Sequence, residues 1–221
     1  MRQILVQALW LLLAVSMVGC GGSETSPGDT AAGLEGDAVE TSSGVSSAPK
    51  VQAPPTVRIE TSLGTITVVL EPEKAPLTVR NFLSYVDDGH YDGTIFHQVV
   101  DGYIVLGGGF TPEFEEKPVL EAIRNEAHNG LQNRRGTIAM ARQADAIDSS
   151  TCQFFINLAD NPELDHKDRE APEAYGYCVF GRVTEGLEVL DKIGKVQVQD
   201  REGFQMVPVQ PVAIRSIKRW H

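Results

Sequence analysis

GTIFHQVVDGYIVLGGGF, residues 93–110, is the stretch that decides the fold. A β-branched run from Thr94 to Val100 is followed by an Asp-Gly pair (101–102), a second short apolar run (103–106) and three glycines (107–109). Asp-Gly tolerates positive φ angles, and β-branched residues suit a pleated surface. The order therefore predicts two short strands joined by a tight turn, that is, a β-hairpin.

The segments on both sides of this hairpin carry further strand and helix patterns. From Val57 to Leu70 apolar and polar residues alternate around a turn at 62–64, which predicts a hairpin with one buried face. Amphipathic spacing predicts one helix from Pro76 to a stop at Gly89 and a second over 184–193. More strands are expected at 136–141, 152–158, 177–183 and 212–220.

Seven or eight short strands, two helices and frequent glycine or proline turns favour a mainly β fold. A closed or nearly closed antiparallel β-barrel fits this order better than a parallel α/β sheet, because parallel strands need a helix between them. Closure also leaves no strand edge exposed. The two helices are expected to cap the open ends of the barrel.

Residues 1–20 have the layout of an export signal. Arg2 precedes an apolar segment from Ile4 to Val18, and Gly19-Cys20 follows. The segment 17–20 resembles a bacterial lipobox, which predicts lipidation of Cys20. An ordinary signal peptide and an uncleaved apolar anchor are the alternatives. We therefore expect an exported lipoprotein, anchored in a membrane and facing the periplasm or the cell exterior.

Residues 21–55 form a second non-globular segment. They are rich in Gly, Ser, Thr, Ala and Pro and contain no aromatic residue, so they cannot bury enough apolar area to become ordered. Five acidic residues against one lysine give the segment a net charge of −4. A disordered spacer is expected, with a partner-binding segment as the alternative. The folded domain is placed at residues 56–221.

Composition excludes several function classes. The formal charge of −11 opposes binding to nucleic acid, which relies on clustered Lys and Arg. The three cysteines show no CxxC pattern and no histidine pairing at zinc-site spacing, so no metal or other cofactor is expected. The glycines at 107–109 lack a P-loop lysine, and no GxSxG element supports a serine hydrolase.

Six segments in series resemble the cyclophilin-type peptidyl-prolyl cis-trans isomerases, especially the compact bacterial ones. They are APLTVRNFLSY (75–85), IFHQVVDGY with GGGF (95–110), NEAHNGL (125–131), RGTIAMAR (135–142), TCQFFIN (151–157) and GYCVFGRVTEGLEVLDKI (176–193). The resemblance covers nearly the whole domain, from Val57 to Trp220. It implies an eight-stranded antiparallel closed β-barrel capped by two α-helices, and a monomer that acts on Xaa-Pro segments of unfolded or exported proteins.

The chemistry that this resemblance implies makes and breaks no bond. Rotation about a prolyl peptide bond has a barrier of about 18–20 kcal/mol and takes roughly tens of seconds without a catalyst. An enzyme accelerates it by binding the twisted amide better than the planar one. In cyclophilins the main donor is an arginine directly after a Phe-His pair, and here that position is Gln98. Gln153 matches the family glutamine that holds the peptide backbone.

The resemblance also assigns substrate-binding positions along the groove. Tyr177 stands where many eukaryotic members have histidine, and Leu106 replaces a glutamine that supports the arginine. The other positions keep their expected character. The assigned residues are Tyr103, Ile104, Leu106, Ala141, Phe155, Leu164 and Tyr177.

Gln98 and Leu106 together remove a cation and one of its partners. A hydrogen bond to a charged group is worth about 1.5–3 kcal/mol and a neutral one about 0.5–1.5 kcal/mol, so a weakened isomerase is predicted. This hypothesis predicts measurable catalysis and a gain on Gln98→Arg. The alternative is a catalytically silent, proline-peptide-binding or chaperone-like module. It predicts binding without a rate effect, and no rescue by Gln98→Arg alone.

The histidines and cysteines are expected to be structural or solvated. His97 is interpreted as a hydrogen-bonded histidine within a strand. Cys152 and Cys178 lie in strands that the family places close together, so they form either two buried free thiols or a disulfide. Solvent-exposed positions are expected for His90, His128, His166 and His221.

Overall fold

A computed structural model describes residues 53–168 and 171–220. The predicted export signal, Cys20, the spacer up to residue 52 and His221 lie outside the described residues. Within the described ranges, no helix has the length and apolar character needed to cross a membrane.

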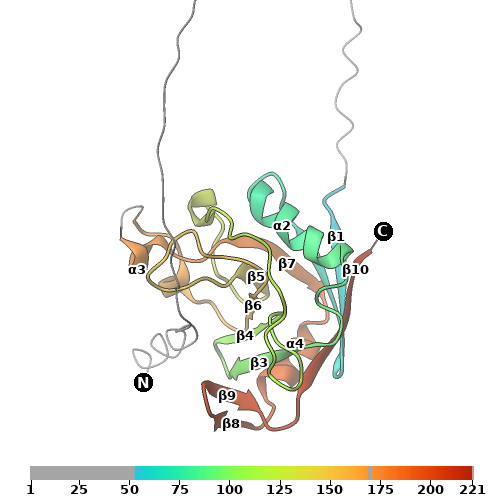
Figure 1. Ribbon diagram of the computed structural model, residues 1–221. Helices are drawn as coiled ribbons and strands as arrows, with labels where there is room; N and C mark the ends of the chain where they lie inside the picture. The colour runs from blue at the N-terminus through green and yellow to red at the C-terminus, as the bar shows by residue number, and fades with distance from the viewer. Residues whose placement is uncertain (1–52, 169–170, 221) are drawn as a thin grey trace, which may run out of the picture. The chain divides into compact units, whose positions relative to one another are not determined.

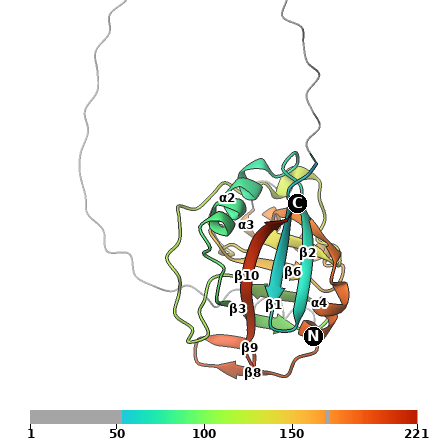
Figure 2. The same cartoon turned by 90° about the vertical axis from the view of Figure 1, so that its right-hand side faces the viewer.

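Eight antiparallel strands close into a barrel, in the order β1-β10-β3-β4-β6-β5-β7-β2. This confirms the predicted mainly β barrel. Figure 2 shows β10, β1 and β2 side by side, where the last strand pairs with the first. The strands are β1 (Thr56–Thr61), β2 (Gly64–Leu70), β3 (Thr94–Val100), β4 (Ile104–Gly107), β5 (Thr137–Met140), β6 (Phe154–Asn157), β7 (Val179–Glu185) and β10 (Val212–Trp220).

The hairpin that dominates the sequence is β3 and β4. The two strands pair antiparallel, with Val100 opposite Ile104. Gly102 in the turn has a φ of 68°, the left-handed conformation that a tight Asp-Gly turn requires. A bulge between Phe96 and Gln98 lets both residues pair with β4. The pattern of residues 93–110 therefore predicted this element correctly.

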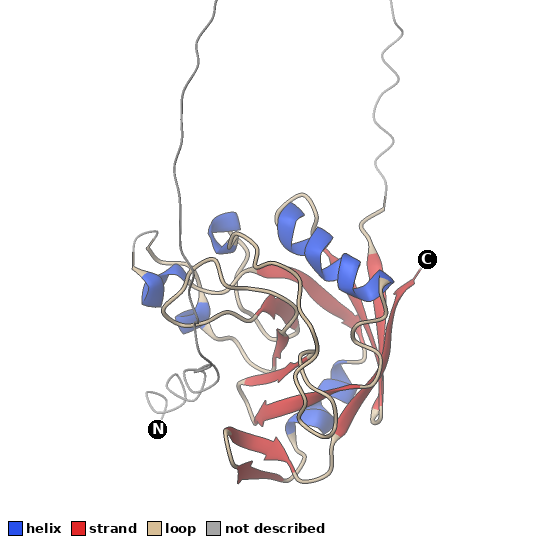
Figure 3. Ribbon diagram, in the orientation of Figure 1, coloured by secondary structure: helices blue, strands red, loops and turns tan. Residues whose placement is uncertain are grey.

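Two helices, α2 (Pro76–Asp87) and α4 (Leu187–Gly194), cap the barrel, as Figures 1 and 3 show. They lie at opposite ends, because α2 follows the end of β2 while Val189 of α4 packs against Gly64 at its start. Shorter helical turns are α3 (Pro172–Tyr175), η1 (Ala127–Asn129) and η2 (Pro162–Leu164).

The predicted start of the second helix, at residue 184, is wrong by three residues. Glu185 still pairs with Thr67 of β2, so β7 continues to that point before α4 begins at Leu187. Gly186 makes the break, with a φ of 90° and a position where a Cβ would lie 2.4 Å from the Thr65 carbonyl oxygen. Strand pairing therefore overrides the helical spacing of these residues.

Helix α2 is held to the barrel interior by aromatic contacts. Phe82, which is fully buried, lies with its ring centroid 5.3 Å from Tyr91, 5.6 Å from Phe154 and 5.1 Å from Phe180. Edge-to-face and tilted pairs at these separations are favourable beyond the area that they bury. This contact joins the helix to strands β6 and β7 of the barrel wall.

The N-terminus of α2 is capped from a distant part of the chain. The helix has no acidic residue in its first turn and no local side-chain cap. Instead, the backbone N–H groups of Leu77 and Thr78 donate to the Glu126 carboxylate at 3.1 and 2.8 Å, and the Thr78 hydroxyl donates to it at 2.8 Å. A carboxylate here satisfies free N–H groups and faces the positive end of the helix.

Replacing Glu126 with alanine is expected to lower the free energy of unfolding by about 1–2 kcal/mol, the usual cost of a lost N-cap. Urea unfolding at pH 7 measures it. Glu121→Ala is the matched control, because Glu121 is an exposed glutamate of the same loop region. Equal unfolding midpoints for the two variants would contradict the capping role.

A two-stranded sheet, β8 (Val198–Arg201) and β9 (Phe204–Pro208), was not predicted. Strand β9 packs against β3, at the lower edge of the barrel in Figure 1. The ring of Phe204 lies against Phe110 and Phe114 at 5.1 and 4.8 Å. Met206 has a φ of 54°, and its N–H donates to a carboxylate oxygen of Asp200 at 3.0 Å. The hairpin thus covers the outer side of β3.

Candidate active site

A second apolar cluster lies on the outside of the barrel wall; we call it the outer cluster. Neighbouring strand residues point to opposite faces, so Phe154 and Ile156 belong to the interior core while Phe155 points outward. The members are Val100, Tyr103, Ile104, Leu106, Ala139, Phe155, Leu164 and Val179, with Leu131, Ala141, Tyr177 and Met206 packed against them.

The outer cluster contains or contacts all seven residues predicted to bind substrate. Leu106 of β4 and Ala139 of β5 both pair with Phe155 of β6, which places the fully buried Phe155 ring at the centre. The Tyr177 ring meets Phe155 edge-on at 5.6 Å. Burial raises the pKa of the Tyr103 and Tyr177 phenols, so both remain neutral. The seven side chains predicted to bind substrate thus lie together in or against one apolar cluster.

Gln98 lies on the same outer face, directly across the β3–β4 ladder from Leu106. Paired residues of two antiparallel strands have side chains on one face and in contact. The Gln98 side chain is 3% exposed and makes no hydrogen bond with another side chain or backbone group of the described residues. Its amide therefore offers two donors and an acceptor beside the apolar surface.

Gln153 precedes β6 and reaches the site from the other side. Its backbone carbonyl accepts a hydrogen bond from the Ala141 N–H at 3.0 Å, which fixes the two residues beside each other. Its side chain crosses Gly109, where a Cβ would lie 2.7 Å from Gln153 Cγ and 2.9 Å from Nε2. The third glycine of the triplet thus leaves the space that the Gln153 amide occupies.

Arg142 is the buried cation nearest to these residues, and it does not replace the missing arginine. It is 8% exposed, and its guanidinium lies 5.0 Å from the centre of the Tyr177 ring. All of its nitrogen atoms donate to backbone carbonyls, among them Gly176 at 3.0 Å and Gln143 at 2.7 Å. Four of its five N–H groups are therefore used to hold loops together.

Three buried asparagines hold the outer cluster in place, and the sequence did not predict this role for them. Asn161 donates to the Tyr103 carbonyl at 3.0 Å and to the Asn157 side-chain oxygen at 2.8 Å. Asn133 donates to the Leu164 carbonyl at 3.0 Å and accepts from Asn157 at 3.2 Å. The network ties two predicted proline-binding residues to the ends of β5 and β6. Within residues 53–168 and 171–220, no cluster of acidic, His or Cys side chains suits a metal ion.

Comparison with known proteins agrees with this geometry. Residues 56–219 match the family described as cyclophilin type peptidyl-prolyl cis-trans isomerase/CLD. The chain belongs to this cyclophilin family. Its domain is 52% identical over 163 residues to peptidyl-prolyl cis-trans isomerase cyp18 of Streptomyces antibioticus, covering 74% of this chain and 97% of that one. It is 45% identical to peptidyl-prolyl cis-trans isomerase B of Escherichia coli, covering 73% and 97%.

Solved structures show the same fold. A crystal structure of a cyclophilin-type isomerase from Cryptosporidium parvum superposes with a TM-score of 0.63 at 25% identity, over 76% of this chain and 98% of that one. Within this cyclophilin, the roles predicted for Gln98, Gln153 and the seven outer residues stay predictions, although the fold gathers them on one face.

The histidines next to this face require two corrections. His97 was expected to be hydrogen-bonded, but it is fully buried and neither ring nitrogen has a partner. It packs against the Phe110 ring at 4.8 Å, and burial lowers its pKa to about 3. His90 was expected to be solvated, but it is partly buried against Tyr85 and has Nε2 3.2 Å from the Gly108 carbonyl oxygen. The aromatic rings that bury them come from other elements, which the local sequence did not reveal.

The remaining histidines and the cysteines are also placed. His128 is exposed as expected, whereas His166 is partly buried with Nδ1 2.7 Å from the Tyr175 carbonyl oxygen. Cys152 and Cys178 are free, buried thiols, which is one of the two predicted alternatives. Burial raises their pKa values to about 11 and about 12, so both stay protonated at neutral pH.

Replacing Gly109 with alanine is expected to lower kcat/KM for a prolyl peptide by about tenfold. The added methyl displaces the Gln153 amide, and a misplacement of about 1 Å can cost up to 10² in rate. Gly109 does not have a positive φ, so the melting temperature should change little. A double-mutant cycle with Gln153→Ala measures the coupling. Full additivity of the two effects would show that Gly109 does not act through Gln153.

Proposed function

We propose that this cyclophilin is a monomeric peptidyl-prolyl cis-trans isomerase of reduced rate, acting on Xaa-Pro segments of unfolded, exported proteins. The observation that carries the proposal is the position of Gln98, paired with Leu106 beside the apolar outer cluster that contains Phe155. No cofactor is needed for this reaction.

In the proposed mechanism the proline ring packs on Tyr103, Phe155 and Leu164, where burial of apolar area holds it. Gln153 binds the peptide backbone on one side of the proline. The Gln98 side chain then donates to the amide group as it rotates out of plane. This hydrogen bond is stronger to the twisted amide than to the planar amide. It therefore lowers the free-energy barrier to rotation about the prolyl bond.

The reduced rate follows from the neutrality of Gln98. A neutral donor stabilises the twisted amide by about 1.4 kcal/mol less than a guanidinium, which corresponds to about tenfold in rate. Leu106 contributes no polar group that could compensate, and four of the five N–H groups of Arg142 already donate to backbone carbonyls.

Two-dimensional NMR exchange on an Ala-Pro test peptide tests the proposal. With the full chain present, cis-trans exchange should be faster than in buffer, and resonances of Phe155 and Tyr177 should shift. Saturable binding with exchange no faster than in buffer would sink the enzymatic proposal. It would instead support a catalytically silent module that binds proline peptides. This second candidate function is favoured by Gln98 and Leu106, which together replace the family arginine and its partner.

We propose further that the enzyme is exported and anchored through lipid on Cys20. The support is the layout of residues 1–20 and the lipobox-like segment 17–20. In cells supplied with a labelled fatty acid, the native chain should incorporate label and Cys20→Ser should not. Label in Cys20→Ser would contradict Cys20 as the lipidated residue, and an unlabelled native chain in the membrane fraction would favour an uncleaved anchor.

A further inference from the structure

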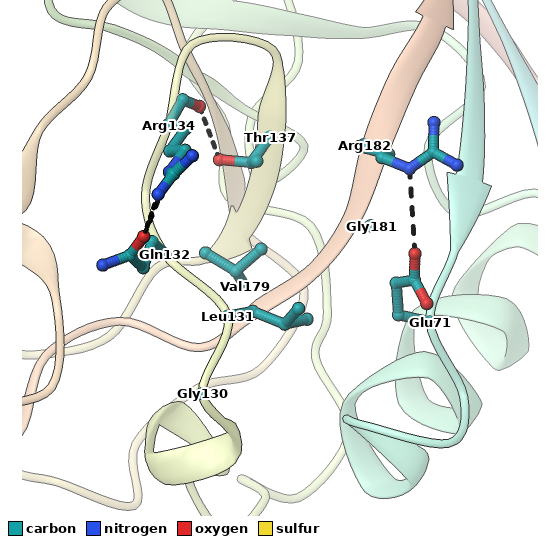
Figure 4. A pocket seen from close by; sticks show the side chains of 9 residues that line it. All are labelled: Glu71, Gly130, Leu131, Gln132, Arg134, Thr137, Val179, Gly181 and Arg182. Atoms are coloured by element: carbon teal, nitrogen blue, oxygen red, sulfur yellow. Dashed lines mark hydrogen bonds and ion pairs between the residues drawn. The ribbon is translucent and has the colours of Figure 1, made fainter.

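A cavity of about 270 Å³ lies on the barrel wall, and none of the seven predicted substrate-binding residues lines it. Figure 4 shows it between β5, β7, the loop at 130–134 and Glu71 at the end of β2. Several of its rim residues, among them Gln132, Arg134 and Arg182, are exposed, so the cavity is open to solvent. Its volume suits one or two amino-acid side chains, since pockets for drug-sized ligands are about 300–1,000 Å³.

The floor of this cavity is apolar. Val179, which is 2% exposed, is a member of the outer cluster, and Leu131 packs against that cluster. Both side chains point into the cavity in Figure 4, between its two polar sides. The cavity floor and the predicted proline-binding surface therefore share one continuous layer of apolar side chains.

Two arginines line the cavity on opposite sides, and among the described residues only one carboxylate, that of Glu71, lines it as well. Arg134 donates to the neutral side-chain oxygen of Gln132 at 3.0 and 2.6 Å. Arg182 Nε lies 3.8 Å from a carboxylate oxygen of Glu71, too far for a hydrogen bond. Arg182 therefore forms a long ion pair with Glu71, whereas Arg134 contacts a neutral group, and the two arginines against one glutamate leave an excess of one positive charge at the rim.

We propose that this cavity is a second binding site for client polypeptides, which takes an acidic side chain next to an aliphatic one. The aliphatic side chain packs on Leu131 and Val179, and the carboxylate accepts hydrogen bonds from Arg134 or Arg182. A guanidinium is the donor that best matches a carboxylate, because its planar fork can make two parallel bonds. The choice of a client chain as occupant rests on the proposed function.

A second site changes how long a client stays bound. A client that occupies the cavity presents its neighbouring prolines to the outer cluster at a high effective concentration, without any new contact at the prolyl bond. The two sites are independent in chemistry, since one holds a proline ring and the other a carboxylate beside an aliphatic group.

Titration of the full-length, ¹⁵N-labelled chain with the proline-free peptide acetyl-Gly-Leu-Glu-Gly-amide tests the site. Amide resonances of Leu131 and Val179 should shift on saturation. Arg134→Gln and Arg182→Gln should each weaken binding by about two- to fivefold, the range of exposed ion pairs. Arg135→Gln is the matched control, because this neighbouring arginine is exposed, pairs with Asp191 at 2.7 Å and does not line the cavity.

Two further peptides separate charge from apolar contact. A peptide with Gln in place of Glu should bind the native chain about as weakly as the original peptide binds Arg134→Gln or Arg182→Gln. A peptide with Gly in place of Leu should bind several-fold more weakly than the original. Native affinity in both arginine variants, or shifts confined to Phe155 and Tyr177, would overturn the proposal. Because the peptide contains no proline, the result is independent of whether the chain accelerates prolyl isomerisation.

Discussion

A Gln98→Arg/Leu106→Gln double variant is expected to catalyse prolyl isomerisation at least about tenfold faster than the native chain. The arginine supplies a charged donor to the twisted amide, and the glutamine across the β3–β4 ladder supplies a polar partner that orients the guanidinium. Exchange rates of one Ala-Pro peptide at equal enzyme concentration give kcat/KM for both proteins.

The single variants act as controls for this prediction. Gln98→Arg alone is expected to give a smaller gain, because Leu106 is 5% exposed and offers no hydrogen bond to a guanidinium withdrawn from water. Leu106→Gln alone should give no gain, since the donor to the substrate is still neutral. A folded double variant with native kcat/KM would show that Gln98 does not occupy the position of the catalytic donor.

Lowering the pH from 8 to 5 is expected to reduce the free energy of unfolding by about 2 kcal/mol through His97 alone. Burial lowers the folded-state pKa of His97 from 6.5 to about 3, so in this window the unfolded chain binds a proton that the folded chain excludes. Stability is therefore full above pH 6.5, falls as the pH drops below it, and stops falling near pH 3. Urea unfolding at several pH values measures the slope.

His97→Leu should remove most of this slope. The variant also deletes two buried ring nitrogens that have no hydrogen-bond partner, so no stability should be lost at pH 8 beyond a small packing change. His90 keeps a weaker slope of the same sign, because burial lowers its pKa too. The Asp87 carboxyl, whose pKa Arg219 lowers, loses its contribution only at more acidic pH. An unchanged slope in His97→Leu would contradict the assignment.

The barrel was predictable because its strands carry strong local signals. The alternation in Val57 to Leu70 and the Asp-Gly turn at 101–102 both specify antiparallel pairing between neighbours in sequence. The later strands are short and apolar, and their boundaries shifted by one or two residues. The hairpin β8–β9 was missed, because its surroundings are polar and its position is set by contacts of Phe204 with distant rings.

The candidate site was predictable as a set of residues but not as a set of contacts. The family motifs named Gln98, Gln153 and the outer residues, and the register of β3, β4 and β6 placed them on one face. Asn133, Asn157 and Asn161 are distant in sequence from Tyr103, whose carbonyl group accepts a hydrogen bond from Asn161. No local sequence pattern therefore reveals this network. No local pattern reveals that Glu126 caps α2, or that the ring nitrogens of His97 have no hydrogen-bond partner.

The pairing of the first strand with the last has a consequence for biosynthesis. Thr56 of β1 lies opposite Trp220 of β10, so the barrel seam needs residues from both ends of the domain. Until residues 212–220 have been synthesised, the edges of β1 and β3 have no partner between them. We therefore expect the barrel to close late in biosynthesis, only once β10 can pair with both β1 and β3.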